Sequence, residues 1–264
     1  MAYTWVHRFL KPYYVCNLGA LLLYLAFRRY AVHARGLAGG RLFNAGELWA
    51  WEKQAFGTYG AAMCVKATRM TSIDSFLADV ILFGKTTVLL LCWMMDQRVF
   101  VWYVVLFVVL FTLLQQPMYD GPQRIEYFTP AALLDRCLKP GRTDGVTWVV
   151  TFYAGWSPPC VYLEPVVAEL SLKYSTEALR FAKLDLGRWP HVGQQQNIQV
   201  HPNSDQLPTL IMFDGGKEVA RIPHVFADNS VARGRFRKND IVKGFDLERR
   251  AKAPAAAAAN KKTK

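Results

Sequence analysis

The sequence has few cysteines, five among 264 residues, and their number is odd. Three of them lie in the apolar first part of the chain, at Cys16, Cys64 and Cys92, and only Cys137 and Cys160 follow. A small secreted domain that is held together by disulfides needs a larger, even set. A disulfide framework is therefore excluded, and cysteine usage gives no reason to place the later part of the chain in an oxidising compartment.

Signals for metal binding and N-glycosylation are also missing. His191 and His201 have no spacing relative to Cys160 that suits a metal site. No N-x-Ser/Thr sequon occurs in the chain, which fits a soluble part that does not enter the secretory lumen. We predict neither a metal nor a cofactor.

Acidic residues are outnumbered by basic ones, 20 against 32, which gives a net charge of +12. Through Gln116 the sequence has 11 basic and 5 acidic residues, and after it 21 and 15, so both parts share the excess. This balance suits nucleic acid, an anionic membrane surface or the positive flanks of membrane spans. Because no nucleic-acid-binding module accompanies it, even near the basic cluster Arg233–Lys238, we predict no nucleic-acid partner.

Long apolar runs are absent after Pro117, but four occur before it. Val99–Leu114 is uncharged and, extended by the next few residues, can cross the roughly 30 Å hydrocarbon layer of a bilayer. Val80–Met95 contains Lys85, which must snorkel to the surface or face another helix. Tyr13–Phe27 is short and flanked by basic residues, so it is either an uncleaved anchor or the core of a signal peptide.

The fourth run, Gln54–Val65, is weaker and contains glycine, which is consistent with an interfacial helix or with a span. The chain is therefore predicted to have three parts, and the lipid bilayer is the predicted partner of the first. These are a membrane region over 1–118 with two to four helices (13–27, 80–95, 99–116 and, if it crosses, 54–65), a soluble domain over 119–251 and a flexible tail over 252–264.

The orientation is predicted from basic residues. Seven Lys or Arg residues lie in the stretch from Arg28 to Arg69. Short cytosolic loops are enriched in such residues, so we expect this stretch on the cytosolic side. The two later spans then cross out and back, and the chain re-enters the cytosol at Pro117. The soluble part is accordingly expected in the cytosol.

Beyond Pro117 the pattern alternates between strand and helix. The sequence predicts strands over 146–153, 179–186, 209–213 and 218–222 and helices over 161–174, 191–200 and 239–250. Asp214-Gly215-Gly216 is a hairpin turn signal between the last two strands. The order strand, helix, strand, helix, hairpin, helix is typical of an α/β sandwich.

Three short motifs refine this prediction. Gly155–Cys160 reads G-W-S-P-P-C between the first strand and its helix, Pro165 follows five residues after Cys160, and Leu207-Pro208-Thr209 opens a later strand. These features resemble thioredoxins, which have W-C-x-x-C at the first place, a helix-kinking proline at the second and a cis-proline loop at the third. The resemblance implies an α/β thioredoxin-like sandwich domain preceded by an α-helical membrane region.

Several longer segments are similar to the thioredoxin-related transmembrane protein 2 family. They are Y-D-G-P-Q-R-I-E-Y-F (119–128), L-S-L-K-Y (170–174), Q-L-P-T-L-I (206–211) and F-D-G-G-K-E (213–218). That family has several apolar segments, a thioredoxin-like domain with one active-site cysteine in S-x-x-C form and a di-lysine tail. The resemblance implies an endoplasmic reticulum membrane protein in which Lys261 and Lys262 form a sorting signal that is read in the cytosol.

The resemblance implies that this site lacks part of the thioredoxin machinery. Ser157 stands where thioredoxins have the attacking cysteine, and a hydroxyl does not take part in thiol–disulfide exchange. Cys160 stands at the resolving position, and Thr151 replaces a buried acid that moves protons. Lys183 and Asp185 lie at alternate positions of one strand and are expected to form a buried polar pair.

Cys160 is therefore either a small core residue or a redox-responsive thiol that forms a mixed disulfide, a glutathione adduct or an intermolecular bridge. We predict a redox-sensing, client-binding protein without classical dithiol activity, in which an extended client peptide lies beside Trp156, Cys160 and Pro208. A homodimer bridged between two chains is a further partner hypothesis. Two other functions stay open: a monothiol oxidoreductase or isomerase that uses glutathione as resolving thiol, and a membrane scaffold.

Overall fold

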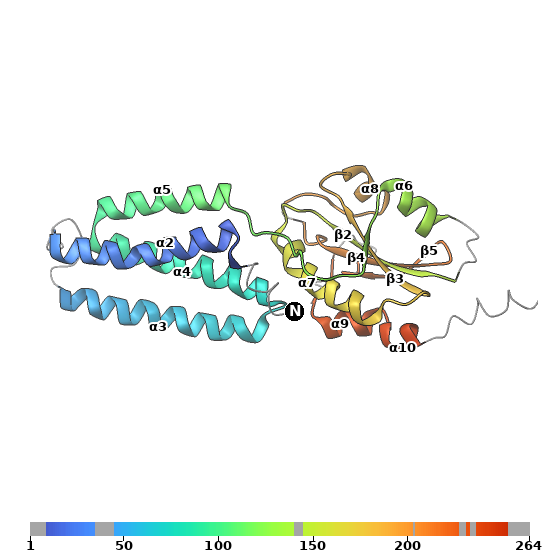
Figure 1. Cartoon of the computed structure of the whole chain (residues 1–264), viewed down its shortest axis with the longest axis horizontal. Coiled ribbons are helices and arrows are strands. Elements are labelled where there is room, and N and C mark those ends of the chain that lie inside the picture. The colour runs from blue at the N-terminus through green and yellow to red at the C-terminus, as the bar shows by residue number, and fades with distance from the viewer. Residues whose placement is uncertain are drawn as a thin grey trace, which may run out of the picture. The chain divides into compact units, whose positions relative to one another are not determined.

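The computed structural model describes residues 9–34, 45–139, 145–202, 204–226, 231–232 and 236–252. Their contacts divide the chain into two compact units, Met1–Pro117 and Met118–Lys264, one residue before the boundary expected from the sequence. The first unit consists of helices, and the second contains a mixed sheet (Figure 1). Each unit is described by itself.

The described part of the first unit has four long helices, which lie lengthwise beside one another (Figure 1). They are α2 (Pro12–Arg29), extended by the π-helical turn η1 (Tyr30–Ala34), α3 (Ala45–Arg69), α4 (Ile73–Met95) and α5 (Gln97–Leu113). Side chains set their ends. The Ser72 hydroxyl accepts the Ser75 N–H at the start of α4 (3.2 Å). Asp96 ends α4 and caps α5 by accepting the Arg98 N–H (2.8 Å).

Two of the described helices are long and apolar enough to cross a bilayer, Pro12–His33 and Ile73–Met95. Helix α5 is apolar but has only 17 residues. Large apolar side chains on these helices, such as Leu22, Leu82 and Trp102, are exposed outside the bundle. An apolar outer face is what a helix in contact with lipid requires, because lipid tails are as apolar as a protein core.

The buried ammonium group of Lys85 is paired inside this unit. Lys85 of α4 is 4% exposed, and its ammonium donates to Asn17 Oδ1 of α2 at 2.7 Å. The ammonium also lies 4.8 Å from the centre of the Phe107 ring of α5. Of the two placements that the sequence allowed for Lys85, the structure shows the one in which it faces neighbouring helices.

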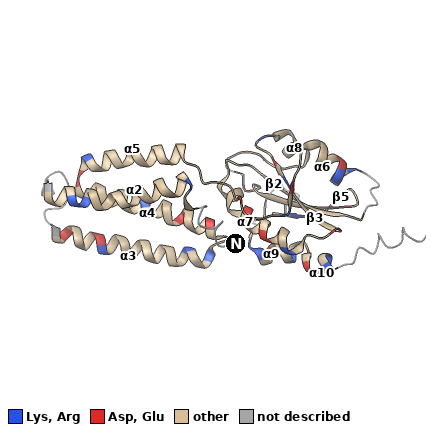
Figure 2. Ribbon diagram, viewed as in Figure 1, with Lys and Arg blue, Asp and Glu red and all other residues tan. Residues whose placement is uncertain are grey.

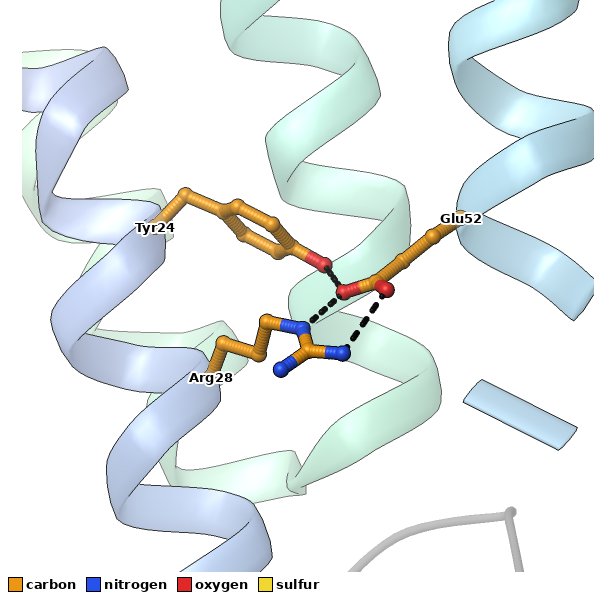
Figure 3. A network of polar contacts seen from close by, with 3 residues as sticks. All are labelled: Tyr24, Arg28 and Glu52. Carbon is orange, nitrogen blue, oxygen red and sulfur yellow. Dashed lines mark hydrogen bonds and ion pairs between the residues drawn. The ribbon is translucent and has the colours of Figure 1, made fainter. Parts of the chain in front are cut away.

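A second polar network joins α2 to α3 (Figure 3). Glu52 of α3 is buried, and Arg28 of α2 binds both of its carboxylate oxygens, Nε to Oε1 at 2.5 Å and Nη2 to Oε2 at 3.1 Å. The Tyr24 hydroxyl donates to Oε1 as well. A buried carboxylate is costly unless it is paired, so these contacts determine which face of α3 meets α2.

Helix α3 runs antiparallel to both α2 and α4. Its beginning meets Arg28 near the end of α2, and farther along it Tyr59 donates to the Val80 carbonyl (3.1 Å) and Lys66 pairs with Asp79 (3.2 Å). A helix of 25 residues is about 37 Å long. The basic residues from Arg28 to Arg69 therefore do not share one end, and Figure 2 shows Lys and Arg toward both ends of the helices. The number of basic residues in this stretch therefore predicts the side of the membrane on which the stretch lies only if α3 does not cross the membrane.

The second unit contains a five-stranded sheet with the order β1-β3-β2-β4-β5. Its strands are β1 (Ile125–Tyr127), β2 (Thr147–Tyr153), β3 (Leu179–Asp185), β4 (Thr209–Asp214) and β5 (Lys217–Ile222). β1, β3 and β2 are parallel, whereas β4 and β5 are antiparallel. The β4–β5 hairpin turns at Gly215 and Gly216, both with positive φ, as the turn signal predicts. β1 has three residues and was not anticipated.

Helices cover both faces of the sheet, which confirms the predicted sandwich (Figure 1). Alternate β2 side chains point to opposite faces, so Phe152 belongs to one apolar cluster and Val149 to the other. The first cluster includes residues of α6 (Pro130–Leu133), the π-helical turn η2 (Leu134–Leu138) and α8 (Pro190–Gln195). The second includes residues of α7 (Pro158–Tyr174), α9 (Lys238–Gly244) and α10 (Leu247–Lys252).

Two helix predictions needed correction. The helix expected over 191–200 ends at Gln195. The closing helix expected over 239–250 is two helices, because Asp246 adopts a left-handed backbone (φ 50°) between α9 and α10. A positive φ at a residue other than glycine interrupts a right-handed helix.

The Glu52 network generates a stability prediction. Glu52→Gln removes the negative charge that Arg28 binds. It should lower the free energy of unfolding of the first unit, Met1–Pro117, here called the membrane unit, by about 1–3 kcal/mol. The measurement is thermal unfolding of the detergent-solubilised full chain. Gln54→Ala, at an exposed position of the same helix, is the control and should leave the midpoint unchanged. Equal midpoints for both variants would contradict a stabilising role of the network.

Candidate functional site

The G-W-S-P-P-C segment forms the turn from β2 into α7. The Ser157 N–H donates to the Ala154 carbonyl at 3.0 Å, and the Cys160 N–H donates to the Ser157 carbonyl at 3.0 Å. Pro158 and Pro159 occupy the first helical positions, where a backbone N–H has no partner within the helix. The turn therefore places Cys160 in the first turn of α7, as the sequence predicts.

Cys160 is a buried thiol, 4% exposed. Its sulfur accepts the Ala154 N–H at 3.4 Å. Burial raises the pKa of the thiol above its ordinary value, and the hydrogen bonds from the Ala154 N–H and the Ser157 side chain offset this only in part. The nearby carboxylates Asp185 and Glu164 raise the pKa further. At neutral pH Cys160 is therefore a protonated thiol and a poor nucleophile.

Ser157 and Pro208 are buried, whereas Trp156 is exposed. Ser157, at the position of an attacking cysteine, is 6% exposed, and Trp156 is 41% exposed. Pro208 follows a cis peptide bond and precedes β4, whose Thr209 pairs with Phe152 of β2. Pro208 thus lies at the sheet end where the Cys160 turn begins. Lys261 and Lys262, the predicted sorting signal, lie outside the described residues.

The exposed surface around the thiol is apolar. Trp156, Pro158 and Pro159 are all exposed. The Trp156 indole lies against the backbone of Gly187, since a methyl group placed on Gly187 would be 3.5 Å from the indole nitrogen. This contact orients the aromatic ring next to the turn. The site therefore combines an inaccessible thiol with an accessible apolar rim.

A carboxylate that sequence reasoning missed lies beneath the thiol. Glu164 of α7 is 7% exposed and forms an ion pair with Lys183 of β3, with 2.5 Å between Oε1 and Nζ. The expected pairing of Lys183 with Asp185 is wrong, because Asp185 accepts the Gly187 N–H instead (2.8 Å). Glu164 follows Cys160 by four residues, a spacing that places both on one face of a helix and that could have revealed it.

These groups surround a cavity of about 20 Å³. Among its lining residues are Thr151, Cys160, Glu164 and Lys183. Thr151 Oγ1 is buried and has no hydrogen-bond partner among the described residues. Glu164 of α7 thus brings a carboxylate into the cavity that Thr151 of β2 also lines. Within the described ranges, no group of three or more His, Cys, Asp or Glu side chains could hold a metal.

The chain is similar to known thioredoxins and to thioredoxin-related membrane proteins. The thioredoxin family model matches residues 142–231. Thioredoxin-related transmembrane protein 2-B of Danio rerio is 32% identical over 93% of this chain and 78% of its own length. The Drosophila melanogaster homolog of thioredoxin-related transmembrane protein 2 is 34% identical over 69% of this chain and 66% of its own. Thioredoxin NaTrxh from Nicotiana alata is 23% identical, with a TM-score of 0.38 over 51% of this chain and 98% of that one.

A relative that aligns over both units, apolar helices that are long enough to cross a membrane and a thioredoxin domain lead to one conclusion. The chain belongs to the thioredoxin-related transmembrane protein 2 family.

Proposed function

We propose that this protein is a redox-responsive, client-binding protein of the endoplasmic reticulum membrane with Cys160 as its single active-site thiol. The observation that carries the proposal is the combination of a buried Cys160 thiol of raised pKa with a serine at the attacking position. Both features slow thiol–disulfide exchange. They argue against a thiol that turns over rapidly, and they require that Cys160 become exposed before it can respond to stress or to a bound partner.

The dithiol cycle is unavailable to this turn. In that cycle an exposed thiolate attacks a substrate disulfide, and a second thiol of the same site releases the product. Ser157 cannot perform the first step. Cys160 can still form a mixed disulfide when it is exposed. Its thiol first loses a proton to solvent, the thiolate attacks a client disulfide, and one client sulfur leaves as a thiolate that takes up a proton from solvent. The mixed disulfide then persists until a thiol such as glutathione resolves it.

Client binding is proposed for the exposed rim. Trp156, Pro158 and Pro159 offer apolar surface without a charged side chain. Exposed aromatic side chains are frequent binding hot spots. The partner that fits this rim is an extended, apolar client segment, and a second copy of this chain bridged through Cys160 is one such partner.

The location is proposed from the lysine pair together with the packing of the helices. Lys261 and Lys262 resemble a di-lysine signal of endoplasmic reticulum membrane proteins, which is read in the cytosol and so supports a cytosolic thioredoxin domain. Because α3 packs antiparallel along α4, we include α3 among the crossing helices, so that α2, α3, α4 and α5 cross in turn. The connection between α2 and α3 then lies in the lumen.

Insulin reduction with glutathione tests the absence of classical activity. We expect a rate at least roughly 100-fold below that of a dithiol thioredoxin, because only a small fraction of Cys160 is ionised and exposed. Cys160→Ser should lower this residual rate to that of glutathione alone, and mixed disulfides trapped through Cys160 in cells should disappear. A rate comparable to that of a thioredoxin, lost in Cys160→Ser, would instead establish a monothiol oxidoreductase. A scaffold would show no Cys160-dependent trapping.

Ser157→Cys tests whether serine alone prevents dithiol chemistry. The variant should form a disulfide between the introduced thiol and Cys160 that is detectable as a mobility shift after thiol alkylation. Turnover should stay at least about tenfold below that of a thioredoxin, because the buried carboxylate is held by Lys183 and the double proline stiffens the turn. Ser157→Cys combined with Cys160→Ser is the control for the shift. Rapid insulin reduction by Ser157→Cys would show that this argument is wrong.

Protease treatment of sealed microsomes tests the topology. An epitope between Ala255 and Asn260 should be digested in intact vesicles, and a second epitope after Gly39 should be protected until detergent is added. Digestion of both epitopes would mean that α3 does not cross. Protection of the first would refute the cytosolic thioredoxin domain. Lys261→Ala combined with Lys262→Ala should move the protein out of the endoplasmic reticulum in fluorescence microscopy.

A further inference from the structure

The segment Met118–Arg124, which joins Pro117 to β1, is fastened to α7 at two points. The Tyr119 N–H donates to Glu164 Oε2 at 2.8 Å, and the Arg124 N–H donates to Ser171 Oγ at 3.0 Å. Glu164 and Ser171 are seven residues apart and therefore lie on one face of α7, about 10 Å from each other along its axis. The segment follows this face between the two hydrogen bonds.

Both acceptors also have a contact outside the segment. The other oxygen of Glu164 is engaged by Lys183, so the carboxylate cannot turn away from the Tyr119 N–H. The Ser171 hydroxyl donates to the Ala168 carbonyl at 2.7 Å, which leaves its oxygen lone pairs for the Arg124 N–H. Glu164 and Ser171 are 7% and 0% exposed. Each anchor is thus fixed by a second contact that does not involve the segment.

The first residue of the segment closes the cavity next to Cys160. Met118 and Cys160 line the same cavity of about 20 Å³. The Met118 sulfur also reaches the turn that carries the thiol, because a methyl group placed on Gly155 would lie 3.9 Å from it. Met118 therefore forms part of the wall of the cavity that Cys160 lines, although it belongs neither to the turn nor to α7 nor to the sheet.

We propose that Met118–Arg124 is a strap that closes the Cys160 site, and that its release from α7 is what makes the thiol accessible. Met118 follows directly after Pro117, the last residue of the first unit. The inference deepens the proposed role of Cys160, since a thiol that responds to partners needs a way to become exposed. Local opening of such a segment costs less than global unfolding.

Peptide-resolved alkylation of the full chain in detergent micelles tests the strap without any client. In Met118→Ala we expect the iodoacetamide labelling rate of Cys160 to rise by roughly tenfold, because the covering side chain is gone. Ser171→Ala should raise it about threefold, although position 171 lies 11 residues and some 16 Å along α7 from Cys160. Met118→Leu, which keeps an apolar side chain of similar size, should label at the parent rate.

Cys137 is the internal control. It is 1% exposed and lies in η2. Its labelling rate should stay constant in all three variants. If Cys160 labels at the parent rate in Met118→Ala and Ser171→Ala, or if Cys137 accelerates in parallel, the strap proposal is overturned. If the labelling of Cys160 depends on the strap but no client is trapped, the strap proposal stands and the client-binding proposal fails.

Discussion

A buried carboxylate must have partners for both oxygens, and in the thioredoxin domain that constraint is met at Glu164. Lys183 of β3 engages one oxygen and the Tyr119 N–H the other, so one side chain of α7 connects the sheet, the helix and the strap around a single cavity. Without Lys183 the Glu164 carboxylate would be a buried charge without a counter-charge, and without Glu164 the Tyr119 N–H would lose its acceptor. The position of the strap and the environment of the Cys160 thiol both depend on this contact.

The same constraint organises the membrane unit. Glu52 is buried between α2 and α3 and is neutralised by Arg28, and Lys85 is enclosed between Asn17 and the Phe107 ring. Apolar packing distinguishes poorly between faces of a helix that is surrounded by lipid, whereas a buried charge permits only one arrangement. The polar contacts therefore select the neighbours and the direction of α3, a helix that is too polar to be recognised by hydropathy alone.

The site combines an accessible rim with an inaccessible thiol. Trp156 is exposed while Cys160 and Ser157 are buried, so a partner would meet apolar surface before it could meet sulfur. In a dithiol enzyme the attacking thiolate is exposed at the same place, which makes binding and chemistry simultaneous. Here they are separated, and Cys160 can react only after the protein opens. This separation is the physical basis for proposing a responsive thiol.

The sequence by itself determined the thioredoxin-like sandwich, the turn that places Cys160 at the start of α7 and the presence of apolar helices before Pro117. Strand composition, turn residues and short motifs are local, and local patterns can be read from neighbouring positions. Only the tertiary structure decided that Glu164, not Asp185, pairs with Lys183, that α3 separates Arg28 from Arg69, and that Met118 closes the thiol cavity. Each of these depends on residues from different elements, and the buried charge that selects a partner acts only once those elements have packed together.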